Sequence, residues 1–165
     1  MIAAFLKSKG NRYLITAVLA LAAARCLWLW QPARQVELHQ RHFLDAAQDR
    51  KWGKLNAMFA DDFRTPTGHD KAWALNQSHE VLRQFIALEI RDSDTAVTMQ
   101  GDTGRVSTML HIEGSGMQLA ELAKSAVNQS TAPFEFTWKH KSWMPWDWRL
   151  TGVDHPLLHV GTEFD

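Results

Sequence analysis

Histidines and carboxylates are the side chains of this 165-residue sequence best suited to acid–base or metal chemistry. His111 and Glu113 form one suggestive pair, because alternate residues of a strand share a face and such a pair can move protons. His39 and His42 form another, since a spacing of three on a helix can present two imidazoles to one metal ion. No third ligand lies near them in the sequence, so we predict no metal site.

Motifs of other common chemistries are missing from the sequence. It has no glycine-rich phosphate loop, no triad order of Ser, His and Asp, and a single cysteine, Cys26. His155 and His159 flank Pro156 in what we interpret as a loosely held tail, and we expect both to be surface residues. The sequence therefore predicts no cofactor.

Three amphipathic helices are predicted ahead of the strands. Residues 33–50 carry an apolar stripe at helical spacing, and residues 51–63 carry a second one. Pro66 interrupts the pattern, because the residue before a proline avoids the α region. A third helix is predicted to start after Asp70, a favourable N-cap, and to run through Trp73 to Ile86.

The period of the apolar residues then changes from about 3.6 to about 2, which is typical of strands. Strands are predicted over residues 88–91, 95–99 and 106–113, with turn-forming clusters between them. A short helix is predicted over residues 117–127. Residues 134–152 then predict a hairpin around Pro145 that holds four of the eight tryptophans.

Alternation sorts the strand residues onto two faces. One face must pack against the helices, since exposing it would forfeit about 1.5 to 3 kcal/mol for each large apolar side chain. Its residues are Val106, Thr108, Leu110, Ile112, Phe134, Phe136, Trp138, Trp146, Trp148 and Leu150. We expect Trp138 and Trp148 to be buried against the third helix. His111 and Glu113 fall on the opposite, outward face, away from any pocket.

The N-terminal 32 residues differ in composition from the rest. Lys7, Lys9 and Arg12 precede an apolar run that starts at Tyr13. Two interpretations remain open: a signal peptide cleaved near Ala24, or an uncleaved anchor over residues 13–30. The anchor predicts a single pass through a bacterial inner membrane, with the domain of residues 33–165 in the periplasm, whereas cleavage predicts a secreted domain.

Charge argues against nucleic-acid binding. Residues 31–165 contain 14 basic and 18 acidic side chains, so the predicted domain is net negative. A domain that binds nucleic acid usually presents a basic surface.

The order of three helices, an antiparallel meander and a Trp-rich hairpin resembles the nuclear transport factor 2-like superfamily. That superfamily includes SnoaL-like cyclases, ketosteroid isomerase and scytalone dehydratase. The similarity covers residues 34–154, and its most characteristic pieces are the early helices ending at Phe63 and the last strand, Trp148 to Val153. The resemblance implies an α+β fold in which N-terminal helices pack on a curved antiparallel sheet, a cystatin-like cone, preceded here by one hydrophobic helix.

The resemblance also suggests where a pocket would lie. We expect Trp73, Leu110, Phe136, Trp138 and Trp148 to line it. Ketosteroid isomerase and scytalone dehydratase use tyrosines, whereas the single tyrosine here is Tyr13, outside the predicted domain.

A SnoaL-like cyclase needs a general base with a raised pKa in an apolar pocket. Near the mouth of the cone, the resemblance offers Asp154, His140 and His79 as weak candidates for that role. We therefore expect a ligand-binding or assembly module without catalysis, the alternative being a cyclase, dehydratase or isomerase acting on a small apolar substrate. The superfamily commonly pairs two subunits through the outer sheet face, which predicts a weak homodimer or another protein partner there.

Overall fold

The computed structural model describes residues 13, 15–21, 25, 28 and 30–159 of the chain. Its helices are α3 (Pro32–Gln48), α4 (Trp52–Met58), α5 (Lys71–Leu82) and α6 (Gln118–Gln129), with a 3-10 turn, η1, at Pro156–Leu158. Its strands are β1 (Phe85–Gln100), β2 (Thr103–Gly116), β3 (Phe134–His140) and β4 (Trp148–Asp154). The strands form one antiparallel sheet in the order β1-β2-β3-β4. The predicted α+β class is confirmed.

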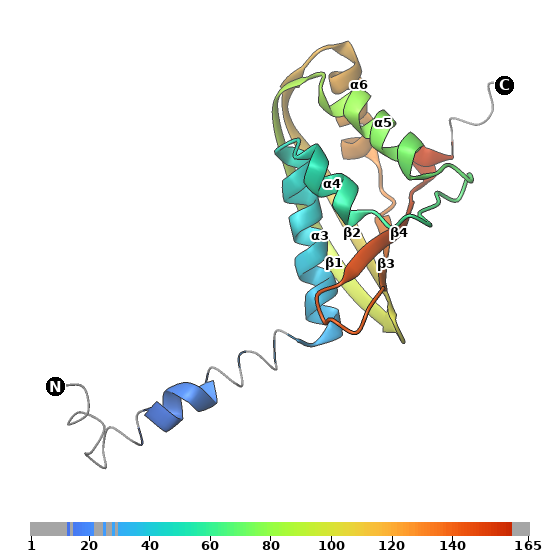
Figure 1. Ribbon diagram of the computed structural model, residues 1–165. Coiled ribbons are helices and arrows are strands. Elements are labelled where there is room, and N and C mark those ends of the chain that lie inside the picture. Colours follow the sequence, from blue (N-terminus) through green and yellow to red (C-terminus); the bar gives the residue numbers. More distant parts are fainter. Residues whose placement is uncertain (1–12, 14, 22–24, 26–27, 29, 160–165) are drawn as a thin grey trace.

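Helix α3 lies along the sheet, as Figure 1 shows, and supplies one wall of the core. Pro32 occupies its first turn, where a missing N–H costs nothing. Its buried stripe includes Val36, Gln40, Leu44 and Ala47, the positions that helical spacing predicts. The helix ends where Arg50 adopts a left-handed conformation, with φ of 54°.

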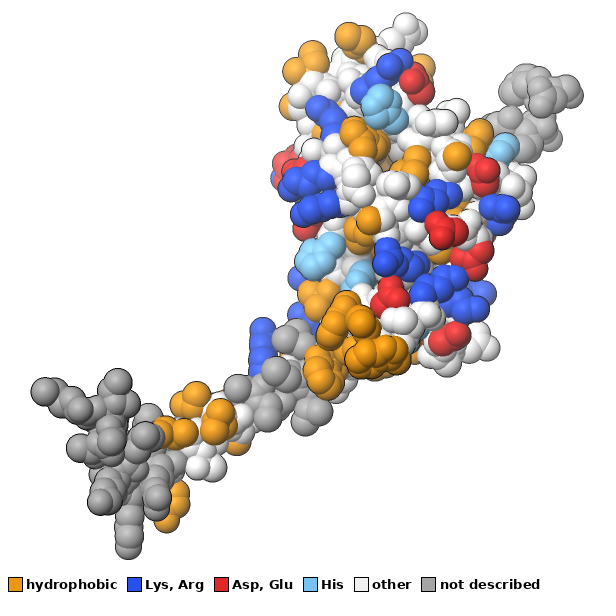
Figure 2. Space-filling view, viewed as in Figure 1, with side chains coloured by type: hydrophobic (Ala, Val, Ile, Leu, Met, Phe, Trp, Pro, Cys, Tyr) orange, Lys and Arg blue, Asp and Glu red, His pale blue; other side chains and the backbone are white. Residues whose placement is uncertain are grey.

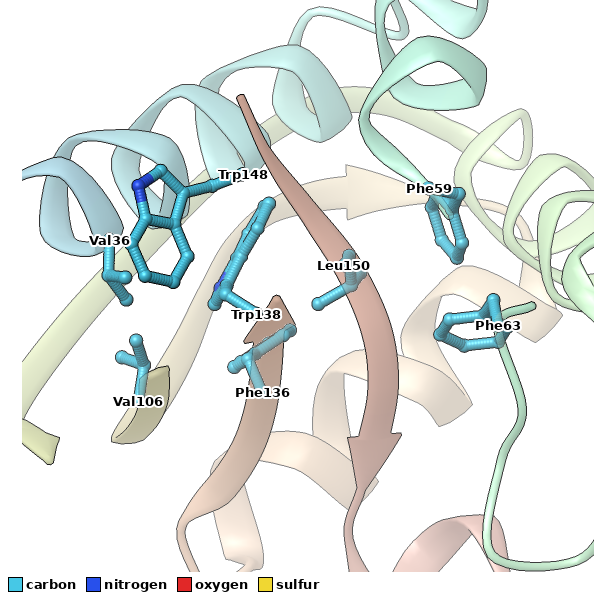
Figure 3. Packing of buried hydrophobic residues seen from close by; sticks show 8 residues of the cluster. All are labelled: Val36, Phe59, Phe63, Val106, Phe136, Trp138, Trp148 and Leu150. Carbon is cyan, nitrogen blue, oxygen red and sulfur yellow. The ribbon is translucent and has the colours of Figure 1, made fainter. Parts of the chain in front are cut away.

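The main core cluster lies between α3 and the last two strands (Figure 3). It contains Val36, Phe59, Phe63, Val106, Phe136, Trp138, Trp148 and Leu150. The indole Nε1 of Trp138 donates to Oε1 of Gln40 at 2.9 Å, which pairs these two buried atoms, whereas Nε2 of Gln40 has no hydrogen-bond partner among the described residues. The expectation that the third predicted helix would cover Trp138 and Trp148 was wrong. That helix is α5, which has no buried residue of its own.

Strand β1 joins two segments that the sequence pattern separated. The cluster around Asp94 is a bulge inside one 16-residue strand, where Asp94 has φ of 53° and the pairing shifts between Ser93 and Ala96. The strand also begins early, at Phe85, which is buried in the sheet although the apolar pattern placed it in the third helix. Both halves of β1 stay paired with β2 on either side of the bulge. Turn-forming residues in the sequence do not distinguish such a bulge from a true turn.

The predicted inward face of the sheet is confirmed with one exception. Val106, Thr108, Trp138 and Leu150 are completely buried, whereas Trp146 is 56% exposed. Trp146 precedes β4, which begins at Trp148, and so lies in the loop and not in the alternating ladder. A strand period assigns faces only to residues that are in the strand.

Among the residues that the structure describes, no helix is long and apolar enough to cross a membrane. The structure thus gives no support to the expected anchor over residues 13–30, several of which lie outside the described residues.

Candidate binding site: an apolar cavity beneath helix α5

A cavity of about 340 Å³ lies between α3, α5 and the inner face of the sheet. This volume falls at the lower end of the range for small-molecule pockets, about 300 to 1,000 Å³. Its walls are aromatic and aliphatic side chains from every layer of the domain, including Phe43, Phe59, Phe63, Trp73, Leu75, Leu82, Ile90, Leu110, Phe134, Phe136, Val153 and Leu158. The domain therefore offers a partly open site suited to an apolar molecule.

Polar side chains are scarce on the walls of this cavity. Thr65, Gln77 and Ser78 are the polar residues there, and no Asp, Glu, Lys, Arg or His is found among the described residues that line it. The hydroxyl of Thr65 is already engaged by the Thr67 hydroxyl at 2.9 Å and the His69 backbone N–H at 3.0 Å. Gln77 and Ser78, neighbours on α5, thus remain as groups that could pair with a polar atom of a ligand.

Helix α5 forms the roof of the cavity. Its start is fixed by Asp70, whose carboxylate accepts the backbone N–H of Trp73 at 2.9 Å, as the sequence predicts. Trp73 lines the cavity, and its ring stacks on that of His69 with centroids 3.9 Å apart. Because no residue of α5 is buried, the helix spans the hollow without filling it.

Three of the five predicted pocket residues line the cavity: Trp73, Leu110 and Phe136. Trp138 and Trp148 do not, because they lie in the neighbouring core beneath α3, as Figure 3 shows. Sequence alternation placed the four strand residues among them on the correct face of the sheet. It could not say which part of that side is filled and which is hollow.

None of the candidate acid–base residues lines the cavity. His79 is exposed and its ring lies 4.8 Å from that of Trp52. His140 is the last residue of β3, and its Nε2 lies 2.7 Å from the carbonyl of Met144 in the loop before β4. Asp154 is 2.7 Å from Nε2 of His159 at the exposed end of β4.

Neither of the pairs that first suggested chemistry lines the cavity. His111 Nε2 is 3.9 Å from Glu113 on the outer sheet face, where Glu113 is also paired with Arg91 at 2.9 Å. His39 and His42 border a surface hollow beside α3. Within the described part of the chain, no group of three or more His, Cys, Asp or Glu residues could hold a metal ion.

His155 is a buried residue that the sequence interpretation missed. It is 1% exposed and stacks on Phe134 at 3.8 Å, so the tail as far as His159 is held against the sheet. Its Nδ1 accepts the Leu157 backbone N–H at 3.1 Å, which leaves Nε2–H to donate to the Ala132 carbonyl at 3.1 Å. Leu158, on the same turn, closes one side of the cavity. The sequence signal for this turn was His155 followed directly by Pro156, because proline is favoured at the first position of a helix and the residue before it can act as the cap.

Burial lowers the pKa of His155 below its ordinary value, because a buried site disfavours the charged imidazolium and favours the neutral imidazole. The unfolded chain, with a histidine pKa of about 6.5, binds this proton more readily as pH falls. We therefore expect stability contributed by His155 to be fully present above about pH 6.5 and to be lost as pH falls toward the folded-state pKa. Urea midpoints at several pH values check this. In His155→Gln, that part of the acid destabilisation should be missing, and an unchanged pH profile would contradict the assignment.

The chain matches no protein-family model and no curated protein in sequence. Solved structures match it in fold. A nuclear transport factor 2-like protein from Cytophaga hutchinsonii is 21% identical, with a TM-score of 0.50 over 73% of this chain and 93% of that one. A proposed dehydratase of the same family from Streptomyces avermitilis is 14% identical, with a TM-score of 0.56 over 74% and 93%.

Bd1075 of Bdellovibrio bacteriovorus also matches, at 10% identity and a TM-score of 0.53. The match covers 73% of this chain but 38% of that one. These likenesses establish the fold alone: helices packed on a curved antiparallel sheet, the cone-shaped arrangement that these nuclear transport factor 2-like proteins share.

Proposed function

We propose that this domain binds a small, neutral, apolar molecule in the cavity beneath α5 and performs no chemistry on it. The observation that carries the proposal is the composition of the walls, about 340 Å³ of space bounded by apolar side chains with no ionisable group among the described lining residues. Apolar surface of a ligand would leave water on entering, which is the main source of affinity in such a site.

The same walls select against a charged ligand. An ionised group buried without a partner loses its hydration and gains nothing in return, so it either stays outside or becomes neutral. A hydroxyl or carbonyl is tolerated, because Gln77 and Ser78 can pair with it on the α5 side of the cavity. The fitting class is an apolar molecule with at most one or two uncharged polar atoms.

The alternative, a cyclase, dehydratase or isomerase, has little to support it. Such reactions need a general base or acid within hydrogen-bond reach of the substrate. His79, His140 and Asp154 contact other protein groups outside the cavity and are absent from its walls. Binding without catalysis is the function that this geometry favours.

Binding of decanol and decanoate to the full chain, measured by calorimetry or by displacement of a neutral fluorescent dye, tests the proposal. We expect decanol to bind at least about tenfold more tightly at pH 8, since leaving a carboxylate unpaired in an apolar site costs more than about 1.4 kcal/mol. Equal or tighter binding of decanoate would contradict a neutral site. No binding of either ligand, or of the dye, would contradict the proposal as a whole.

Two alanines on α5 provide a matched pair of variants. Ala74 lines the cavity, whereas Ala72 is exposed on the same helix. Ala74→Phe should fill part of the hollow and reduce decanol affinity about tenfold or more, whereas Ala72→Phe should leave it unchanged. A similar loss in both variants, or in neither, would place the ligand elsewhere.

A further inference from the structure

The loop between β3 and β4 carries the most exposed aromatic side chains of the described domain. Trp143 is 84% exposed, Trp146 56% and Met144 37%. Tryptophan side chains are usually largely buried, and an exposed cluster of large apolar residues marks an interaction surface. The cavity does not use these residues, because they lie outside its walls.

Hydrogen bonds hold the backbone of this loop, residues 141–147, in a defined conformation. The Lys141 N–H donates to the Asp147 carbonyl at 2.9 Å, and the Asp147 N–H donates to the Met144 carbonyl at 3.0 Å. The indole of the buried Trp148 donates to the Pro145 carbonyl at 3.0 Å, which anchors the loop to the core. Trp143 and Trp146 are therefore presented to the outside by a loop whose backbone is held from within.

The loop lies at the end of the domain where α3 begins. Val36, in the second turn of α3, shares a core cluster with Trp148, and Figure 1 shows the loop beside the start of that helix. Apolar side chains are gathered at this same edge in Figure 2. The chain that precedes α3 is tied to this end as well, because the Arg34 guanidinium lies 4.7 Å from the centre of the Trp28 ring.

The preceding chain exposes apolar side chains too. Trp28 and Trp30 are 40% and 56% exposed, and Tyr13, Val18, Leu19 and Leu21 are more exposed still. Two separate segments, one from each end of the sequence, thus present tryptophan at one edge of the domain. Tryptophan is the side chain that most favours the boundary between lipid headgroups and acyl chains, since its ring is apolar and its N–H can stay hydrated.

We propose that the 141–147 loop inserts Trp143 and Trp146 into the interfacial layer of a lipid bilayer, on the side of the domain where Trp28 lies against Arg34. The charges near the loop are largely compensated, with Lys141 paired to Asp62 at 2.8 Å and Asp147 to Arg149 at 3.1 Å. The contact consequently depends on aromatic partitioning, and a zwitterionic surface suffices.

Quenching of tryptophan fluorescence by brominated phosphatidylcholine vesicles tests the insertion in the full chain. Trp28 and Trp30 are first replaced by Phe, so that the leading segment contributes no signal. In this background we expect clear quenching on vesicle binding, which persists at high salt. Adding Trp143→Phe and Trp146→Phe should remove most of it. The matched control, Trp52→Phe, changes a half-buried tryptophan on α4 and should leave the quenching in place.

Vesicle flotation, run in parallel, separates the outcomes. If the chain floats with vesicles but the loop variants are quenched as strongly as the background, the loop faces water and the proposal is wrong. A chain that does not float at all overturns it equally, and would leave the loop as a contact for another protein. Because Trp143 is exposed, its replacement should not unfold the domain, and the thermal transition of each variant checks this.

Discussion

Trp138→Ala is expected to destabilise the domain by about 3 to 5 kcal/mol, the cost of removing a large aromatic side chain from a packed core. Trp138 is completely buried among Val36, Phe136, Trp148 and Leu150. Its loss also leaves the Gln40 amide oxygen without the indole donor that pairs with it at 2.9 Å. Domains of this size are stable by only about 5 to 15 kcal/mol, so this loss would remove a large share of the free energy of unfolding.

Trp143→Ala is the matched control, because it deletes the same side chain from a position that is 84% exposed. Its free energy of unfolding should stay within about 0.5 kcal/mol of the wild type. Urea denaturation followed by circular dichroism compares the two variants. If both lost the same stability, the assignment of Trp138 to the core and of Trp143 to the surface would be wrong.

Gly114→Ala is expected to cost at least about 2 kcal/mol, from backbone strain together with a steric clash. Gly114 has φ of 129°, a conformation that side chains rarely adopt, and it pairs with Leu88 across the β1–β2 ladder. A Cβ there would overlap the backbone carbonyl of Ala87. The clashing atom belongs to the backbone of the neighbouring strand and not to a flexible side chain, so displacing it would cost considerable free energy.

Gly53→Ala should act in the opposite direction. Gly53 lies in α4, where nothing lies within 4 Å of the position of a Cβ. Alanine there should stabilise the domain by about 0.5 to 1 kcal/mol, because glycine loses more backbone entropy in a helix. Thermal melts of the two variants should therefore shift to opposite sides of the wild type, and a destabilised Gly53→Ala would contradict the environment assigned to α4.

The two proposals concern opposite ends of the domain. The cavity lies beneath α5 and is closed partly by Val127 of α6 and Leu158 of η1, whereas the 141–147 loop lies beside the start of α3 (Figure 1). If the loop rests on a bilayer, the cavity stands away from that surface. A ligand would then reach it from the aqueous side, so the ligand must have some solubility in water or arrive with a carrier.

The sequence by itself determined the α+β class and the alternating face of the last hairpin. The apolar residues of this hairpin alternate along two short strands, and such a period can be read directly from neighbouring residues in the sequence. They are Phe134, Phe136, Trp138, Trp148 and Leu150. The same holds for the start of α5, since Asp70 caps a backbone N–H only three residues away. The absence of catalytic motifs was also evident from residue types alone.

The tertiary structure decided which surfaces meet. Gln40 and Trp138 are 98 positions apart, and no local pattern indicates that α3 and not α5 covers the hairpin. The burial of His155 likewise depends on Phe134 and Ala132, contributed by another strand and the segment before it. The cavity is the least predictable feature, because it is the space that remains when α5 spans the sheet without filling it. Periodicity specifies that a face is apolar, whereas the volume left between two such faces depends on every side chain that enters it.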